Sequence, residues 1–459
     1  MSRYKRNIRI IFMAIAAILL FGVNYSHASP VTVEVGADTP AVISGRTHTV
    51  RARVLLKPVV PAGNRAPIAV ALVIDKSGSM QEDGKIENAK RGALEALKML
   101  DARDIAAVVV YDTKPAVLIK ARAVNETALF AKSISRIKAG GNTALYDGVR
   151  IGAGEIERFL ESGYVPRIIL LSDGLANVGP SSVRELASLG RSLSGRGITI
   201  TTIGLGLDYD EDLMTAVAAA SGGNSYFART RDRLEDIFRR DIQDAVALTC
   251  RDVRITLSCE GDFLPIRSMG RESTATDKDA KEIVVDIGNL YGAEKYAIFE
   301  FEAPAVEAAR VMKACVIRVE YTDAVTGAAV KMESGFDIEY TESEDYVRSL
   351  RDAEIATQAE LARNAEILEQ AITLSDAGRV AEASAVLRER GEYLSRAEYD
   401  AAAPVQKDIV YFDALAEDIS REGGMSNVNR KSSVNQAYTT KNQQSEVERG
   451  SRTRDAIEE

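Results

Sequence analysis

The sequence predicts an α/β fold in which a doubly wound parallel sheet is inserted beside an antiparallel β-sandwich, followed by a helical hairpin and a disordered tail. Three patterns support this. Apolar strands alternate with amphipathic helices between residues 67 and 248, as in a parallel sheet with helices on both faces. Residues 29–66 and 249–341 alternate apolar with polar residues, which is typical of half-buried antiparallel strands. From residue 342 the apolar residues recur at helical spacing.

Residues 1–28 have the layout of a secretory signal peptide. Basic residues from Arg3 to Arg9 precede the apolar run Ile10–Val23, and small residues follow at Ser26 and Ala28. The apolar run is short for a membrane span, so a retained anchor is the less favoured alternative. We therefore expect an exported protein in the periplasm, on the cell surface or secreted, without stable membrane insertion.

The charge and the rare residues exclude several functions. The formal net charge is -9, and removing four basic and no acidic residues with the signal leaves about -13. An acidic surface argues against nucleic acid or anionic lipid as a partner. His48 is the only histidine outside residues 1–28, so histidine-based nucleophilic catalysis and histidine zinc sites have little support.

The strands of residues 29–66 are predicted at Val31–Val35 and Val50–Leu56. Two strands alone do not form a stable sheet, so we expect them to join the later sandwich, with the α/β domain inserted between. That domain, residues 67–248, has predicted strands and helices in alternation. The strands are expected at 68–74, 105–111, 116–119, 167–171 and 198–203, and the helices at 86–100, 126–137, 144–160, 182–193, 210–220 and 234–248.

Residues 249–341 form the predicted β-sandwich. Cys259 and Cys315 both fall on the inward parity of their strands. They are most simply core residues, although a bridge between them is possible in an oxidising compartment. The pairing of the three cysteines is not deducible from the sequence.

Residues 342–421 are predicted to be helical, and residues 422–459 to be a disordered tail. Leu350, Ala353, Leu361, Ala365 and Leu368 form one apolar stripe of a first helix, and a second helix is expected at 380–390. The segment beyond Gly423 is polar with almost no large apolar residues, which is typical of disorder.

The candidate site begins where the apolar run Ile68–Ile74 ends. Asp75, Ser77 and Ser79 follow at alternate positions. Alone, this pattern could simply cap the next helix. However, in open α/β sheets ligands bind at the carboxyl ends of the strands, where the loops around Thr143 and Asp173 are also expected. Two carboxylates and three hydroxyls are hard oxygen ligands, which select Mg²⁺, Mn²⁺ or Ca²⁺.

The motifs DKSGSM (75–80), GGNTAL (140–145) and LLSDGLANVG (170–179) resemble the von Willebrand factor type A (VWA) domain with its metal-ion-dependent adhesion site. The order of segments also resembles exported bacterial proteins with this domain, and it is similar to inter-alpha-trypsin inhibitor heavy chains. The resemblance implies that Ser77, Ser79 and Thr143 contact the ion, with Asp75 and Asp173 binding it directly or through water. It also implies a protein partner that supplies an aspartate or glutamate to the ion.

These observations predict a non-enzymatic, metal-dependent protein-binding module of the cell envelope. The alternative is a structural or assembly protein in which the sandwich and helical tail bind partners and the ion only stabilises the fold. A hydrolase is disfavoured by the single histidine.

Overall fold

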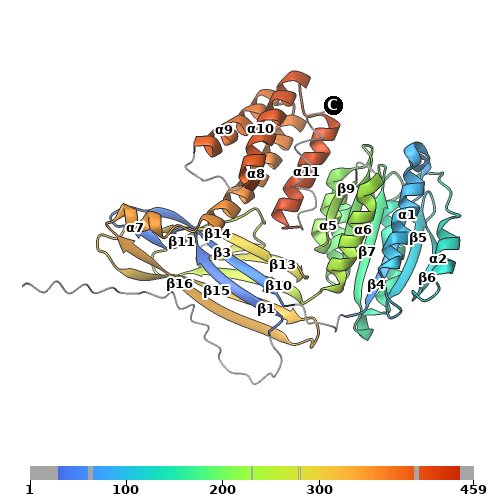
Figure 1. The fold of residues 1–459 in the computed structure, drawn as a ribbon, viewed down its shortest axis with the longest axis horizontal. Helices are drawn as coiled ribbons and strands as arrows, with labels where there is room; N and C mark the ends of the chain where they lie inside the picture. The colour runs from blue at the N-terminus through green and yellow to red at the C-terminus, as the bar shows by residue number, and fades with distance from the viewer. Residues whose placement is uncertain are drawn as a thin grey trace, which may run out of the picture.

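The computed structural model describes residues 29–59, 66–228, 231–277, 279, 281–396 and 403–444. Figure 1 shows a helix-covered sheet at the right of the view and two further sheets at the lower left. A group of helices lies above these two sheets. The predicted signal peptide, residues 1–28, lies outside the described residues.

The helix-covered sheet is the predicted doubly wound α/β unit. Neighbouring strands are parallel except for one antiparallel pair at an edge, β5 with β6. Strand β9 is a short addition that the sequence pattern did not reveal, because four residues carry little periodicity. In spatial order the strands are β6 (Ala116–Ala123), β5 (Ile105–Tyr111), β4 (Ile68–Asp75), β7 (Val165–Ser172), β8 (Thr199–Leu205) and β9 (Ser225–Ala228).

Strand β4 is buried along its whole length and supplies both hydrophobic layers of this unit. Because successive side chains point to opposite faces, Ile68, Val70 and Leu72 pack with α1, α2 and α6, while Ala69 and Val73 pack with α3, α4 and α5. The helices are α1 (Lys85–Lys98), α2 (Thr127–Ile134), α3 (Leu145–Glu157), α4 (Val183–Ser194), α5 (Glu211–Ser221) and α6 (Arg231–Val246), with short 3-10 turns η1 (Gly78–Gly84) and η2 (Leu160–Ser162).

Two more sheets combine strands from before and after the α/β unit. Strand β3 pairs antiparallel with β14, with Val54 opposite Ala297, and the buried side chains of both sheets belong to one hydrophobic cluster. One sheet has the order β1 (Val31–Ala37), β3 (His48–Pro58), β14 (Lys295–Ala303), β11 (Leu264–Met269). The other has the order β12 (Ala275–Asp277), β13 (Glu282–Leu290), β10 (Cys250–Cys259), β15 (Val311–Asp323), β16 (Ala329–Thr341), β2 (Ala41–Ile43).

The C-terminal region is helical, and it contains more than the predicted hairpin. The helices are α7 (Glu344–Ser349), α8 (Ala353–Asp376), α9 (Val380–Arg396), α10 (Ala403–Glu422) and α11 (Asn427–Lys441). Helices α8 to α11 share one hydrophobic cluster that includes Leu368, Leu387, Phe412 and Ala437. Within the described residues, no helix is long and apolar enough to cross a bilayer.

The prediction of a disordered tail from residue 422 is wrong for residues 427–441, which form α11. Ser426 caps this helix by accepting from the Asn429 backbone N–H. Tyr438 is buried and donates to the Gly223 carbonyl of the α/β unit at 2.8 Å. Polar composition suggested disorder, but here the polar groups find partners on other parts of the fold, which composition does not reveal.

Candidate metal centre

The three motif loops meet at the carboxyl edge of the central sheet, and backbone hydrogen bonds join two of them. The Gly78 N–H donates to the Gly141 carbonyl at 2.9 Å, and the Gly140 N–H donates to the Lys76 carbonyl at 2.7 Å. The Lys76 N–H in turn donates to the Tyr111 carbonyl at the end of β5. The loop after β4 is therefore held between the end of β5 and the loop before α3.

Four of the five expected residues are linked by hydrogen bonds among themselves. The Ser77 backbone N–H donates to Asp75 Oδ1 at 2.8 Å, and the Ser77 and Ser79 hydroxyl oxygens lie 3.1 Å apart. Ser79 Oγ donates to Asp173 Oδ1 at 2.7 Å, which connects the loop after β4 to the loop after β7. The structure thus brings Asp75, Ser77, Ser79 and Asp173 into one array.

The fifth residue, Thr143, lies against the same array. A Cβ added to Gly174 would lie 3.2 Å from Ser79 Oγ and 4.0 Å from Thr143 Oγ1, so the two hydroxyls flank one point. Thr143 is buried, its N–H donates to Asn177 Oδ1 at 2.8 Å, and its carbonyl accepts from the Asn177 N–H at 3.1 Å. Asn177 therefore fixes Thr143 beside the loop after β7.

Ser172 and Asn177 support the site, and the sequence analysis did not assign either of them. Ser172 Oγ donates to Asp75 Oδ2 at 2.9 Å, so both oxygens of that carboxylate are held. Both residues lie inside the quoted segment LLSDGLANVG. Their position close to Asp173 in the sequence was the feature that could have pointed to them. Only the fold shows which side chains and backbone groups they contact.

The site favours the binding of a positive charge, because two carboxylates are buried close together. Asp75 and Asp173 are both 0% exposed. Burial raises the pKa of Asp75 to about 6, the hydrogen bonds from Ser77 oppose this, and the nearby Asp173 charge adds to it. A cation between the carboxylates would favour their ionised forms.

Lys85, the first residue of α1, is a further charged group at the site. Its ammonium lies 3.0 Å from Asp173 Oδ2 and 3.2 Å from Asp208 Oδ2. Burial lowers the pKa of Lys85, but the two carboxylates outweigh this and raise it. Asp173 Oδ2 is thus engaged by the Lys85 ammonium, while Asp173 Oδ1 accepts from Ser79 Oγ.

These residues fit a hard divalent cation. In the described part of the chain, no site groups three or more His, Cys, Asp or Glu side chains, so soft-metal cages of that kind are not seen there. The array offers instead two carboxylates and three hydroxyls, the oxygen donors that Mg²⁺, Mn²⁺ and Ca²⁺ take. Two other acidic residues near the site have ion-pair partners: Asp112 pairs with Lys76, and Asp147 pairs with Arg150.

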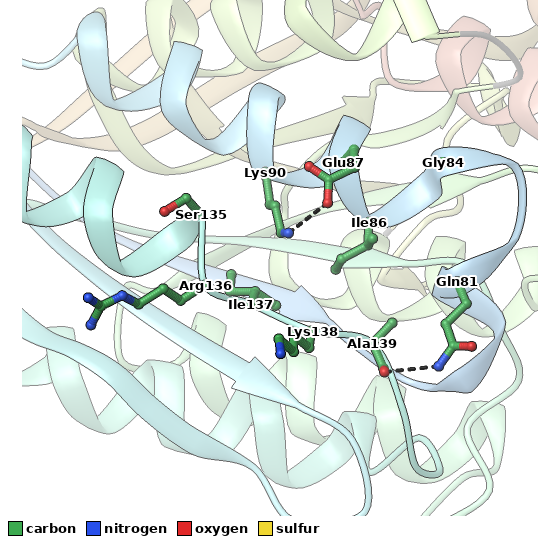
Figure 2. A pocket seen from close by; sticks show the side chains of 10 residues that line it. All are labelled: Gln81, Gly84, Ile86, Glu87, Lys90, Ser135, Arg136, Ile137, Lys138 and Ala139. Carbon is green, nitrogen blue, oxygen red and sulfur yellow. Dashed lines mark hydrogen bonds and ion pairs between the residues drawn. The ribbon is translucent and has the colours of Figure 1, made fainter.

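A cavity of about 500 Å³ opens beside the site, between the start of α1 and the end of α2 (Figure 2). Gln81 Nε2 donates to the Ala139 carbonyl at 3.0 Å across one end, and Lys90 pairs with Glu87 at 2.7 Å. Arg136 and Lys138 are exposed along its wall. Its lining comes from α1 and from residues that adjoin the two loops carrying Ser79 and Thr143.

Comparison with known proteins defines the class of the α/β unit. Residues 69–240 match the family model of the von Willebrand factor type A domain, so this part of the chain is a VWA domain. Domains of this family generally mediate metal-dependent protein interactions.

The relatives by sequence are distant. An uncharacterised protein of Synechocystis, sll0103, is 29% identical over 46% of this chain and 50% of its own length, and YfbK of Escherichia coli is 24% identical over 53% and 42%. Human inter-alpha-trypsin inhibitor heavy chain H4 is 30% identical over 40% of this chain and 21% of its own length. The chain thus spans about half the length or less of these three relatives.

Solved structures show that the likeness in fold extends beyond the VWA domain. The von Willebrand factor type A protein from Catenulispora acidiphila matches with a TM-score of 0.65 over 84% of this chain and 91% of that chain, at 18% identity. The ArnB paralog VWA2 from Sulfolobus acidocaldarius matches with a TM-score of 0.57 over 90% and 98%, at 19% identity. Both matches cover more of the chain than residues 69–240.

Proposed function

We propose that this protein is a non-enzymatic binding module that engages an acidic residue of a partner protein through a divalent metal ion. The observation that carries the proposal is the hydrogen-bonded array of Asp75, Ser77, Ser79 and Asp173, in which both carboxylates are fully buried. Such an arrangement offers several oxygen donors to a cation.

Each residue has a distinct part in holding the ion. The Ser77, Ser79 and Thr143 hydroxyls are the proposed direct ligands, and Asp75 and Asp173 bind directly or through water. Mg²⁺ is the expected ion, with Mn²⁺ or Ca²⁺ as alternatives. The two carboxylates no more than neutralise the charge of a divalent ion, so a third carboxylate, supplied by the partner, is not repelled. We propose that this carboxylate takes a remaining position on the ion.

The surface beside the site suits an acidic partner on one side. The cavity is lined by the basic residues Lys90, Arg136 and Lys138 and by one acidic residue, Glu87. Glu82 and Asp83 are exposed next to Gly84 on the opposite rim, so the favourable wall is the one formed by Arg136 and Lys138. We propose that the partner approaches over this wall.

The protein is proposed to act outside the cytoplasm, as the predicted signal peptide of residues 1–28 indicates. The proposed domains are the strands of 29–66, the VWA domain of 67–248, the β-sandwich of 249–341 and the helices from 342. The VWA domain, together with the β-sandwich, would then present the metal site to partners in the cell envelope.

Calorimetric titration of residues 29–459 with Mg²⁺, Mn²⁺ and Ca²⁺ tests the proposal. We expect binding to the wild type and its loss in the double variant Ser77→Ala with Ser79→Ala. The matched control is Ser192→Ala with Ser194→Ala, two exposed serines of α4, which should bind as the wild type does. If no ion binds the wild type, or if the site variant binds equally well, the mechanism is wrong.

A further inference from the structure

Cys259 and Cys315 face each other across two paired strands. Cys259 is the last residue of β10, and the strand register places it directly opposite Cys315 of β15. Their sulfur atoms are 3.4 Å apart, although the residues are 56 positions apart in the chain. This contact settles which of the three cysteines are neighbours, a point the sequence left open.

The backbone at this position suits a covalent bridge. The Glu260 N–H donates to the Ala314 carbonyl at 2.9 Å, so the next pair along the ladder is hydrogen-bonded and the pair of cysteines is not. In antiparallel sheets the non-hydrogen-bonded pairs bring side chains closest, with Cα atoms about 4.5 Å apart. That spacing lies at the short end of the range found for disulfides, about 4.4 to 6.8 Å.

Cys250 is excluded as a partner for either of them. Cys250 and Cys259 are the first and last residues of the 10-residue strand β10, which places them roughly 30 Å apart at the usual rise of a strand. Cys250 lies opposite Asp323 on β15 and Leu290 on β13. A disulfide requires Cα atoms within about 7 Å, so only one of the three possible pairings is geometrically possible.

We propose that Cys259 and Cys315 form a structural disulfide in an oxidising compartment, and that Cys250 stays a free thiol. The oxidant is a disulfide, either glutathione disulfide or that of a thiol oxidoreductase. One cysteine thiolate attacks a sulfur of the oxidant and releases one thiol as leaving group. The second thiolate then attacks the mixed disulfide and releases the other thiol, so two electrons and two protons pass from the cysteines to the oxidant.

The bond forms while the strands assemble rather than afterwards. In the folded chain Cys259 is 8% and Cys315 is 0% exposed. The contact with Cys259, together with burial, raises the pKa of the Cys315 thiol. The folded protein therefore presents little thiolate for exchange, since the thiolate is the reactive form.

The position of the bridge gives it a structural role. Strand β10 follows α6 of the VWA domain after only three residues, from Val246 to Cys250. A covalent bond between β10 and β15 fixes the strand that connects directly to the VWA domain. It also closes a loop of 56 positions, which restricts the conformations of the unfolded chain. The inference is independent of the metal site.

Refolding with thiol counting tests this. The full chain, unfolded in urea and reduced, is refolded in a glutathione redox buffer, quenched with N-ethylmaleimide under denaturing conditions and weighed by mass spectrometry. We expect one label on the oxidised protein, at Cys250, and three after reduction. Cys250→Ser should carry no label before reduction. Cys259→Ser should carry two labels, at Cys250 and Cys315, or one label at Cys250 and a glutathione adduct at Cys315.

Peptide mapping should recover the peptides of Cys259 and Cys315 joined before reduction, both from refolded protein and from protein exported to a bacterial periplasm. Reduction should lower the melting temperature of the wild type by several degrees and leave that of Cys259→Ala with Cys315→Ala unchanged. Three labels on both preparations, a bridge that includes Cys250, or only glutathione adducts would overturn the proposal.

Discussion

The Lys85 ammonium lies 3.0 Å from Asp173 Oδ2 and 3.2 Å from Asp208 Oδ2, and thereby joins the candidate metal site to the loop after β8. The other side of that loop is held by α11. Asn427 Nδ2 donates to the Leu207 carbonyl at 3.0 Å, and Lys431 Nζ donates to the Tyr209 carbonyl at 2.6 Å. One short loop therefore contacts both the site and the C-terminal helix.

Lys85→Met should destabilise the metal-free protein and increase the stabilisation that metal gives. The lysine side chain is 9% exposed and its partner Asp173 is 0% exposed, and removing one partner of a buried ion pair costs about 3 kcal/mol. A divalent ion replaces the missing positive charge. Urea unfolding with and without Mg²⁺ measures both effects.

The matched control is Lys98→Met on the same helix, where the side chain is 67% exposed. It should change the free energy of unfolding by less than about 0.5 kcal/mol. Equal effects of the two variants, or a smaller metal effect in Lys85→Met, would contradict this role of Lys85.

Ser172→Ala should weaken metal binding without abolishing it. The Ser172 hydroxyl holds Asp75 Oδ2 but is not among the proposed ligands, and loss of a partner that orients a ligand typically reduces affinity about 10- to 100-fold. Calorimetry beside the Ser77→Ala with Ser79→Ala variant compares the two. A complete loss of binding would assign Ser172 a direct contact, whereas unchanged affinity would remove it from the site.

Gly174→Ala should reduce metal affinity while the protein stays folded. The added methyl would lie 3.2 Å from Ser79 Oγ and 4.0 Å from Thr143 Oγ1, between two proposed ligands. Gly154→Ala is the control, because nothing lies within 4 Å of its added Cβ on α3. Titration of both variants with Mn²⁺ gives the comparison, and equal affinities would show that the hydroxyls do not converge on an ion.

Lys431→Met should loosen α11 from the VWA domain. Lys431 is 3% exposed, pairs with Glu211, and lies 4.5 Å from the centre of the Tyr209 ring. Its loss leaves the largely buried Glu211 with Arg430 as its remaining ion-pair partner. We expect hydrogen exchange of residues 427–441 to quicken at least tenfold, corresponding to about 1.4 kcal/mol, while α9 is unchanged. Unchanged protection of α11 would contradict the contact.

The attachment of α11 should also weaken in acid. Burial would raise the pKa of Glu211, but the ion pairs with Lys431 and Arg430 hold it below the ordinary value of 4.5. A lowered carboxyl pKa gives stability that is complete above the ordinary pKa and is lost as the pH falls through the folded value. Protection factors of residues 427–441 should fall below pH 4.5 more than those of α9, and Glu211→Gln should reduce this difference. Identical pH profiles for both helices would refute the prediction.

Local pattern was enough to predict the α/β unit, and it named the five residues whose loops the structure brings together at one edge of the sheet. The apolar run before Asp75 identifies a strand buried on both faces, and the structure confirms β4 as such a strand. The motif positions 75, 77, 79, 143 and 173 could be named because they follow strand ends in a recognisable order. Lys85, Ser172 and Asn177 were not assigned, because nothing local shows which loop each of them contacts.

What the sequence by itself determined is therefore whatever depends on the spacing of neighbouring residues: strand and helix periodicity, the inward parity of Cys259 and Cys315, and the oxygen-rich loops. Only the tertiary structure decided which distant segments meet. The pairing of β3 with β14 and the docking of α11 on the VWA domain are of this kind. These contacts depend on burying surfaces and pairing charges far apart in the chain, and that free energy has no signature in any short stretch of sequence.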